Sequence, residues 1–528
     1  MKLKLFLACL FIISLFLRIY KLADRPLGFT WDEAALGYNA YSILQTGRDE
    51  YNQILPLIFK SFGDYKPGLY IYFTVPSILL FHLTELATRL PSAIFGSLLV
   101  ITMYLLTRRL FSSIPATAAA IVMAINPWHL YFSRGAWEAN LYLFFTALAT
   151  LLFLKRRYLI SALFFGFTLL TYQGAKMFIP LLIISLWLIY RPQLKSLLKP
   201  LLLLFFLSLP VILGLGFQSN RLKVYSIFSY TRKSETITEI LRQDNISTKN
   251  LAYYLFHSEL LDQGRGLLQR YLNHFSPRFL FFAGDWQNLR HSIAYYGYFH
   301  LPDMAMLAVG LFFLIKLSNS SAKLLFAWMF LAPLPSAFSR DLVSGVRSLL
   351  LVIPLVIIIG MGIARLWQKR TLFIIYALIS AFFFAYYIDL FYFHSPYFTA
   401  INMLYPYKPA LQLVKQHLSQ YQKIVFMDEL GQPYIFTLFY LQFDPSIYQK
   451  SSFLTEDPQG DVGHVDKFDK FEFRPIFWSA DHYLTSTMIV GDQYQLPETD
   501  LVKSTNLIRI GEVRYPNGAS ALKVVGLK

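Results

Sequence analysis

Long apolar runs recur along this chain, and they limit its possible folds more than any other feature. A run of about 20 apolar residues is long enough to cross a lipid bilayer as a helix. Only 15% of the residues are charged, whereas water-soluble domains carry roughly a quarter. The sequence therefore predicts a polytopic membrane protein. The runs cover residues 3–20, 69–83, 90–106, 114–130, 141–154, 158–172, 177–190, 201–217, 304–317, 324–338, 346–363 and 371–390.

The net charge of +17 does not indicate a nucleic-acid partner, because no compact basic patch carries an RNA- or DNA-reading motif. A single cysteine, Cys9, excludes disulfides and cysteine-based metal sites. Lys2 and Lys4 precede the first apolar run, and no small-residue cleavage site follows it. We interpret this run as a signal anchor that stays in the protein.

The basic residues predict the membrane topology, because Lys and Arg collect in cytoplasmic loops. The run at 69–83 is short and contains Pro76. If it does not cross, all five basic clusters fall on the cytoplasmic side, so we predict an interfacial or re-entrant helix there. About eleven spans result, in the plasma membrane, with the N-terminus in the cytoplasm. The clusters are Arg108/Arg109, Lys155/Arg156/Arg157, Arg191/Lys195/Lys199, Lys316/Lys323 and Arg365/Lys369/Arg370.

Two domains follow from this topology. Residues 1–391 form an all-α transmembrane domain with outer loops at 21–88 and 218–300. Residues 392–528 form a small extracytoplasmic domain. Its stretch "YKPALQLVKQHLSQY" has helical periodicity, and "KIVFMDE", "TMIVGD", "NLIRIGEV" and "ALKVVGL" resemble strands, so we predict an α/β fold.

The stretch "GFTWDEAALGYN" places Asp32 and Glu33 directly beyond the first span, on the outer side. Acidic residues are favoured in the first turn of a helix, so one interpretation is a capped interfacial helix. The other is a general base, because a carboxylate can take the proton of a hydroxyl group at the membrane surface. The pattern alone leaves both open.

Two further outer segments carry charges. In "SFGDYKPGLY", Asp64 and Lys66 flank Tyr65, and a lysine at headgroup level suits a lipid phosphate. In "NPWHLYFSRGAWEANL", Arg134 and Glu138 have helical spacing, so they either pair with each other or orient a substrate. We treat these five residues as candidates for substrate or carrier binding.

Two later segments add candidates of the same kind. Asp285, Arg290 and His291 lie near the end of the second outer loop, and Arg347 opens a later span from its outer side. An arginine there needs an anionic partner, and a guanidinium can hold a phosphate with two hydrogen bonds. The histidines lack the spacing of a metal motif. We predict no cofactor and leave a divalent metal ion open.

The order of these motifs resembles the GT-C superfamily of glycosyltransferases, in particular protein O-mannosyltransferases and the lipid A aminoarabinose transferase. An N-terminal span is followed by "DE", "GDYKPGLY", "ELATRLPSAIFG" and "NPWHLYFSRGAWEANL". The resemblance is good over residues 1–160, looser over 280–350 and absent from the tail. Relatives often have two prolines after the basic residue, where this chain has "KPG", and tend to have Asp at the position of Glu138.

The resemblance implies an enzyme that transfers a sugar from a polyprenyl-phosphate carrier to an acceptor hydroxyl at the outer face. The catalytic residues would be Asp32 and Glu33, with Asp32 as the base and Glu33 as its neighbour or as a ligand of the acceptor, in a single inverting displacement. Lys66 and Arg347 would hold the carrier phosphate. The acceptor could be a protein, a lipid or a glycan.

Other functions remain open at this point. A polysaccharide polymerase or ligase would also use a lipid-linked glycan at the outer face. A transporter or flippase of lipid-linked sugars would place ionisable residues at mid-membrane, where this sequence has few. A sensor or scaffold would leave the acidic first loop without a role.

Overall fold

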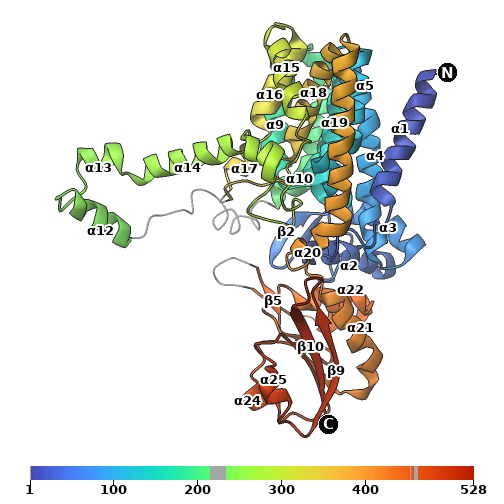
Figure 1. The fold of residues 1–528 in the computed structure, drawn as a ribbon, viewed down its shortest axis with the longest axis vertical. Helices are drawn as coiled ribbons and strands as arrows, with labels where there is room; N and C mark the ends of the chain where they lie inside the picture. The colour runs from blue at the N-terminus through green and yellow to red at the C-terminus, as the bar shows by residue number, and fades with distance from the viewer. Residues whose placement is uncertain (1, 215–233, 340, 452, 457–461) are drawn as a thin grey trace.

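The computed structural model describes residues 2–214, 234–339, 341–451, 453–456 and 462–528. Part of the predicted second outer loop, residues 218–233, lies outside the described residues. A helical bundle forms one end of the molecule and a domain containing a β-sheet forms the other (Figure 1).

In the described chain, eleven bundle helices coincide with predicted apolar runs. They are α1 (Lys2–Ile19), α4 (Glu85–Leu110), α5 (Ser113–Ile125), α7 (Glu138–Leu154), α8 (Tyr158–Leu169), α9 (Ala175–Tyr190), α10 (Leu194–Leu213), α15 (Asp303–Ile315), α16 (Ser320–Leu331), α18 (Val352–Leu366) and α19 (Arg370–Asp389). Short helical segments connect or extend them: α6 (Pro127–Phe132), η2 (Arg278–Ala283), α17 (Leu334–Ala337), η3 (Leu349–Leu351), η4 (Leu390–His394) and α20 (Ser395–Thr399).

Among the described residues, four helical stretches are long and apolar enough to cross a membrane unaided: Glu85–Leu110, Leu194–Leu213, Leu349–Leu366 and Arg370–Thr399. Several other bundle helices are apolar but shorter, and the count of eleven spans stays a prediction. The multi-helix apolar bundle agrees with the predicted class.

Between α1 and α4 lie α2 (Trp31–Thr46), a hairpin of β1 (Ile58–Ser61) and β2 (Asp64–Pro67), and α3 (Leu69–Phe81). The backbone on both sides of α3 contacts the C-terminal domain. The carbonyl of Phe62 accepts from the Gly463 N–H, and the carbonyl of Leu83 accepts from Gln442. Helix α3 therefore stays at one end of the bundle and does not cross it.

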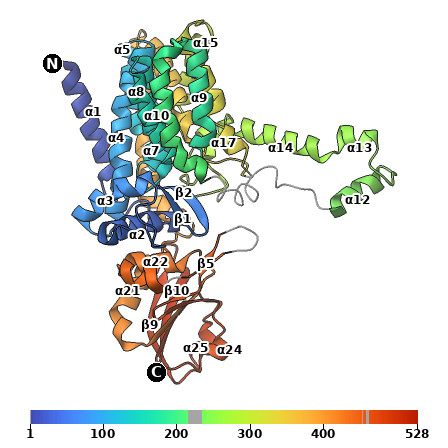
Figure 2. The same ribbon diagram turned by 180° about the vertical axis from the view of Figure 1, so that it is seen from behind.

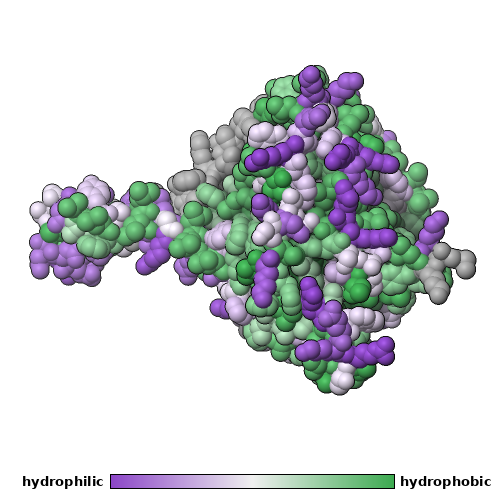
Figure 3. Space-filling model, turned by 90° about the horizontal axis from the view of Figure 1, so that it is seen from above, coloured by the Kyte–Doolittle hydropathy of each residue, from purple (hydrophilic) through white to green (hydrophobic). Residues whose placement is uncertain are grey.

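The opposite end of the bundle carries the basic loops. Arg109, at the end of α4, donates to the Leu154 carbonyl at the end of α7, and Ser321 of α16 donates to the Leu110 carbonyl. Figure 3 looks onto this end and shows hydrophilic side chains spread across it. The predicted clustering of basic loops at one end is therefore present in the fold.

An arm of helices projects sideways from the bundle (Figures 1 and 2). It consists of α12 (Ser234–Gln243), α13 (Leu251–Phe256) and α14 (Glu259–Asn273). Tyr271 anchors its base by donating to the Phe330 carbonyl of α16, 2.9 Å away. The arm thus leaves the bundle at the C-terminal end of α16.

The C-terminal domain is an α/β fold, as predicted. Its six-stranded sheet has the order β6-β7-β3-β8-β10-β9, with β3 parallel to both neighbours and β10 antiparallel to β8 and β9. The four predicted strands and the predicted helix are all present. The elements are α21 (Tyr407–His417), η5 (Leu418–Gln420), β3 (Lys423–Phe426), α22 (Pro433–Tyr440), α23 (Pro445–Ser451), β4 (Leu454–Thr455), β5 (His464–Val465), β6 (Lys467–Phe468), β7 (Phe471–Phe473), α24 (Trp478–Asp481), β8 (Thr487–Gly491), α25 (Glu498–Leu501), β9 (Leu507–Arg514) and β10 (Ser520–Leu527).

The C-terminal domain packs closely on the first outer loop, chiefly through α22 against α2 (Figure 2). Lys408 and Tyr440 bind the Glu85 carboxylate at 2.5 and 2.8 Å. Gln449 donates to Ser42 and to the Asp49 carbonyl. These contacts hold α2 between the bundle and the sheet domain.

Candidate active site

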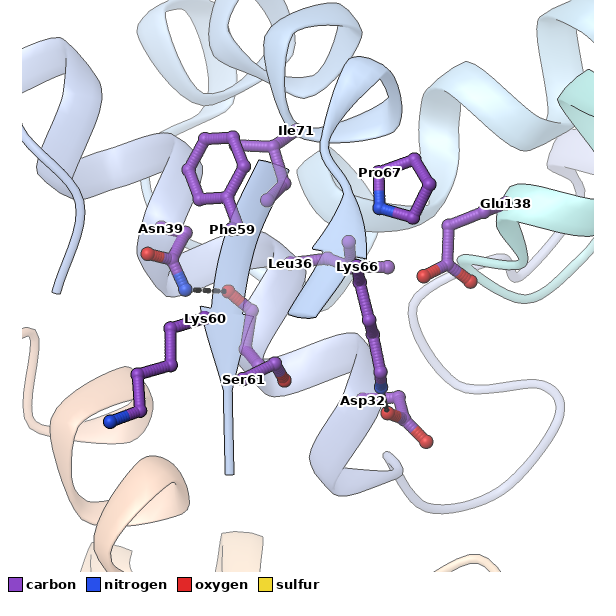
Figure 4. Close-up of a pocket in the computed structure, with 11 residues that line it drawn as sticks. Asp32, Leu36, Asn39, Phe59, Lys60, Ser61, Lys66, Pro67, Ile71 and Glu138 are labelled. Atoms are coloured by element: carbon purple, nitrogen blue, oxygen red, sulfur yellow. Dashed lines mark hydrogen bonds and ion pairs between the residues drawn. The ribbon is translucent and has the colours of Figure 1, made fainter. Parts of the chain in front are cut away.

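A pocket lies where α2, the β1–β2 hairpin and the start of α7 meet. It is lined by Asp32, Lys66 and Glu138 together with Ala35, Leu36, Asn39, Phe59, Lys60, Ser61, Pro67 and Ile71. Figure 4 shows Lys66 reaching from β2 to Asp32, and Glu138 of α7 lines the same pocket. The fold thus brings three charged groups from separate elements together.

Asp32 and Lys66 form an ion pair at this pocket. Their side chains are 33% and 23% exposed, so both are reachable from outside. Glu138 is half-buried and lies within electrostatic reach of both. A carboxylate can accept a proton, and a neighbouring ammonium group can bind an anion. Transfer of a group from a phosphate to a hydroxyl needs both functions.

Arg290 also approaches this pocket, from the second outer loop. Its guanidinium stacks 3.9 Å above the centre of the Trp31 ring and donates to the Asn402 carbonyl at 2.8 Å. Burial lowers the pKa of Arg290, and nearby Asp32 opposes this shift. Arg290 is therefore a second cation beside the base candidate.

Glu33 is adjacent to Asp32 in sequence but has a different environment. It is the third residue of α2 and forms a capping box with Thr30. Its carboxylate also accepts from Arg89 at 2.8 Å and from the Ala136 N–H at 2.9 Å, and it is 1% exposed. Glu33 therefore links α2 to α4 and to the turn before α7.

The chain resembles known proteins in part of its sequence and in its fold. Residues 65–226 match the family model of the dolichyl-phosphate-mannose-protein mannosyltransferases. ArnT from Cupriavidus metallidurans in the apo state is 13% identical, with a TM-score of 0.56 over 99% of this chain and 98% of that chain. ArnT bound to undecaprenyl phosphate is 12% identical, with a TM-score of 0.58 over 98% and 97%.

The chain has the GT-C glycosyltransferase fold. The likeness to ArnT extends over almost the whole chain, the C-terminal domain included. A search of curated protein sequences gave no significant match.

Within this GT-C fold, Asp64 and Tyr65 lie on β2 but do not line the pocket. The Tyr65 carbonyl accepts from Gln173 at 2.5 Å, and Asp64 lies within electrostatic reach of Lys176. Both partners belong to the segment between α8 and the first turn of α9. Sequence reasoning missed this segment, although "TYQGAKM" is a polar interruption between two apolar runs.

Arg134 has a structural position. It is 1% exposed and donates to the carbonyls of Leu17 and Tyr20, at 2.6 and 2.7 Å, at the C-terminal end of α1. Carbonyls at a helix C-terminus have no partner within the helix, so a buried arginine stabilises them. Arg134 neither pairs with Glu138 nor lines the pocket.

The remaining candidates gather around a second pocket. His291 binds the Asp285 carboxylate at 2.9 Å, and Arg347 forms an ion pair with Asp341. The anionic partner that the sequence required for Arg347 is therefore a protein side chain. The sequence feature that could have predicted this ion pair is the position of Asp341, six residues before Arg347 in the same loop.

Sequence reasoning also missed Arg89. It is fully buried in the first turns of α4 and donates to Glu33 and to the Leu22, Pro26 and Gly28 carbonyls. An arginine at the outer end of an apolar helix was the available signal. Among the described residues, no cluster of three or more His, Cys, Asp or Glu side chains could hold a metal ion.

Proposed function

We propose that this chain is an integral-membrane glycosyltransferase that moves a sugar from a polyprenyl-phosphate carrier to an acceptor hydroxyl. The observation that carries the proposal is the Asp32–Lys66 pair, facing Glu138 in a pocket at the outer end of a GT-C fold. The likeness to a protein that binds undecaprenyl phosphate supports a carrier of that class. The reaction would occur at the extracytoplasmic face of the plasma membrane, with a protein, lipid or glycan as acceptor.

The proposed step is one inverting displacement. The acceptor oxygen attacks the anomeric carbon and forms the new glycosidic bond, while its proton passes to the Asp32 carboxylate. The bond between the anomeric carbon and the phosphate oxygen breaks, and the polyprenyl phosphate leaves with the electron pair. Asp32 suits the base because it is accessible, whereas Glu33 is buried in an ion pair with Arg89.

Lys66 and Arg290 would stabilise the charge on the leaving phosphate. Arg290 is preorganised, because it stacks on Trp31 and donates to a backbone carbonyl. Lys66 is paired with Asp32, and an incoming phosphate would draw the ammonium toward itself. Phosphate binding would in this way prepare Asp32 to accept a proton.

Asp32→Asn tests the proposal. We expect transfer to fall about 10²- to 10⁴-fold, the usual contribution of a general base, while donor binding is retained. The assay is sugar transfer by the purified full-length protein from a set of undecaprenyl-phosphate-linked sugars to candidate acceptors. Product analysis shows whether one sugar is added or a glycan is joined.

Asp24→Asn is the matched control, because Asp24 is an exposed carboxylate of the same outer loop. Its variant should transfer at the wild-type rate. Full activity of Asp32→Asn would remove Asp32 as the base. Movement of the intact lipid-linked sugar across vesicles without chemical transfer would instead favour a flippase.

A further inference from the structure

A second pocket lies beside the proposed active site, between the end of the second outer loop and the loop before α18. It has a volume of about 230 Å³ and is lined by Asp285, Gln287, Asn288, His291, Asp341, Val343 and Ser344. All but one of these residues are polar, so the pocket suits a hydrophilic ligand and not a polyprenyl chain.

The base of this pocket is rigidly built. The Asp285 side chain is 1% exposed and accepts from His291 Nδ1 and the Gly345 N–H, each at 2.9 Å, and from the Asn288 N–H at 3.0 Å. Because a carboxylate only accepts, Nδ1 of His291 must carry the proton of that bond. Asp285 thereby fixes the orientation of the His291 ring.

Side chains also tie the two loops to each other. Gln287 Oε1 accepts from the Leu342 N–H at 2.6 Å, and His274 Nε2 accepts from the Ser344 N–H at 3.2 Å. Within the described chain, the amide NH₂ groups of Gln287 and Asn288 donate to no protein group, although both side chains line the pocket. The pocket therefore presents fixed donors beside the Asp341 carboxylate, an arrangement that matches vicinal hydroxyl groups.

The second pocket adjoins the first. The His291 ring packs edge-on against Trp137, with 5.3 Å between centroids, and the next residue is Glu138 of the first pocket. Tyr172 lies within electrostatic reach of Glu138, Asp341 and Arg347. Residues 288–291 run from one pocket to the other, since Asn288 and His291 line the second pocket and Arg290 stacks on Trp31.

We propose that the second pocket binds the sugar of the donor, an inference that rests on the proposed function. The anomeric carbon is one bridging oxygen away from the carrier phosphorus, so the sugar must lie close to Lys66 and Arg290. The second pocket is polar, and two of its lining residues, Asn288 and His291, flank Arg290 in the sequence. Asp285 and Asp341 would repel a carboxylate, so the pocket favours a neutral or amino-substituted sugar over a uronic acid.

Two variants test this assignment. Asn288→Asp keeps the side-chain oxygen that accepts from the Arg290 N–H but replaces the amide donor. His291→Phe keeps the ring that packs on Trp137 but removes its polar atoms. Binding to the purified full-length protein is measured with undecaprenyl phosphate alone and with undecaprenyl phosphate carrying a neutral hexose, an amino sugar or a uronic acid.

We expect wild type to bind at least one neutral or amino-sugar conjugate more tightly than the uronic acid conjugate. Each variant should weaken binding of that conjugate about 3- to 30-fold, the cost of losing one or two hydrogen bonds. Binding of undecaprenyl phosphate alone should not change. Gln495→Glu, in the C-terminal domain, should bind every probe as wild type does.

Equal loss of binding for the bare and the sugar-bearing carrier would overturn the assignment, and so would no loss for either. A change confined to the KM of the acceptor would also overturn it, by making this pocket the acceptor site. If wild type bound neither bare nor sugar-bearing carrier, the proposed function itself would fail, which is a distinguishable result. Thermal unfolding of each variant identifies loss of fold.

Discussion

Two adjacent carboxylates at the start of α2 have different roles because successive helical residues point in different directions. Asp32 reaches the pocket and Lys66, whereas Glu33 turns back to its own N-cap and to Arg89. The sequence left open whether this acidic pair caps a helix or acts as a base, and in the structure the two roles fall to different residues. Capping belongs to Glu33, and the proposed base is Asp32.

Arg89→Met should destabilise the fold, because it leaves the Glu33 carboxylate buried without its ion-pair partner. Breaking a buried pair in this way costs about 3–5 kcal/mol. We expect a lower midpoint of thermal unfolding and a loss of activity. Asp32→Asn should lose activity alone, since Asp32 is partly exposed. Equal midpoints for Arg89→Met and wild type would contradict a structural role for the pair.

At the scale of elements, the decisive feature is that α3 does not cross the bundle. Both flanks of this helix touch the C-terminal domain, so α2, the hairpin and α3 form one layer over the outer end of the bundle. The layer brings Lys66 of β2 to Asp32 of α2. A crossing α3 would reverse the direction of every later helix.

Cysteine labelling tests this arrangement. In a Cys9→Ser background, single cysteines at Asn52 and His82, on either side of α3, should both react with an impermeant maleimide added to intact cells. Both positions are exposed in the fold. A cysteine at exposed Arg156, in a basic loop, should react only after the cells are opened. Protection of the His82 position in intact cells would show that α3 crosses.

At the scale of the whole molecule, the C-terminal domain and the first outer loop are joined by a buried, hydrogen-bonded junction. Glu50 is fully buried at their junction, where its carboxylate accepts from Asn39 at 2.9 Å and from Tyr434 at 3.4 Å. Burial raises the pKa of Glu50 to about 8. These contacts give the C-terminal domain a structural role in holding α2.

We expect the junction to weaken as the pH rises. Between pH about 4.5 and about 8 the unfolded chain loses the Glu50 proton while the folded chain keeps it, so the free energy of unfolding falls across this range. Above pH 8 no further loss arises from this group. Thermal unfolding and limited proteolysis from pH 5 to 9 measure the effect. Glu50→Gln should flatten this dependence, and an unchanged slope would contradict the assignment.

The amino-acid sequence was enough to predict the membrane class, the non-crossing helix, the α/β tail and the resemblance to the GT-C fold. These features rest on hydropathy, charge and periodicity, which act locally along the chain. The partners of the charged groups could be identified only in the folded chain. Arg134 stabilises the end of α1, Arg347 pairs with Asp341 and Glu33 pairs with Arg89, over sequence separations from 6 to 117 residues. A buried charge in a membrane protein is stable beside an opposite charge or beside aligned carbonyl oxygens, and the folding of the chain selects which of these groups lie next to it.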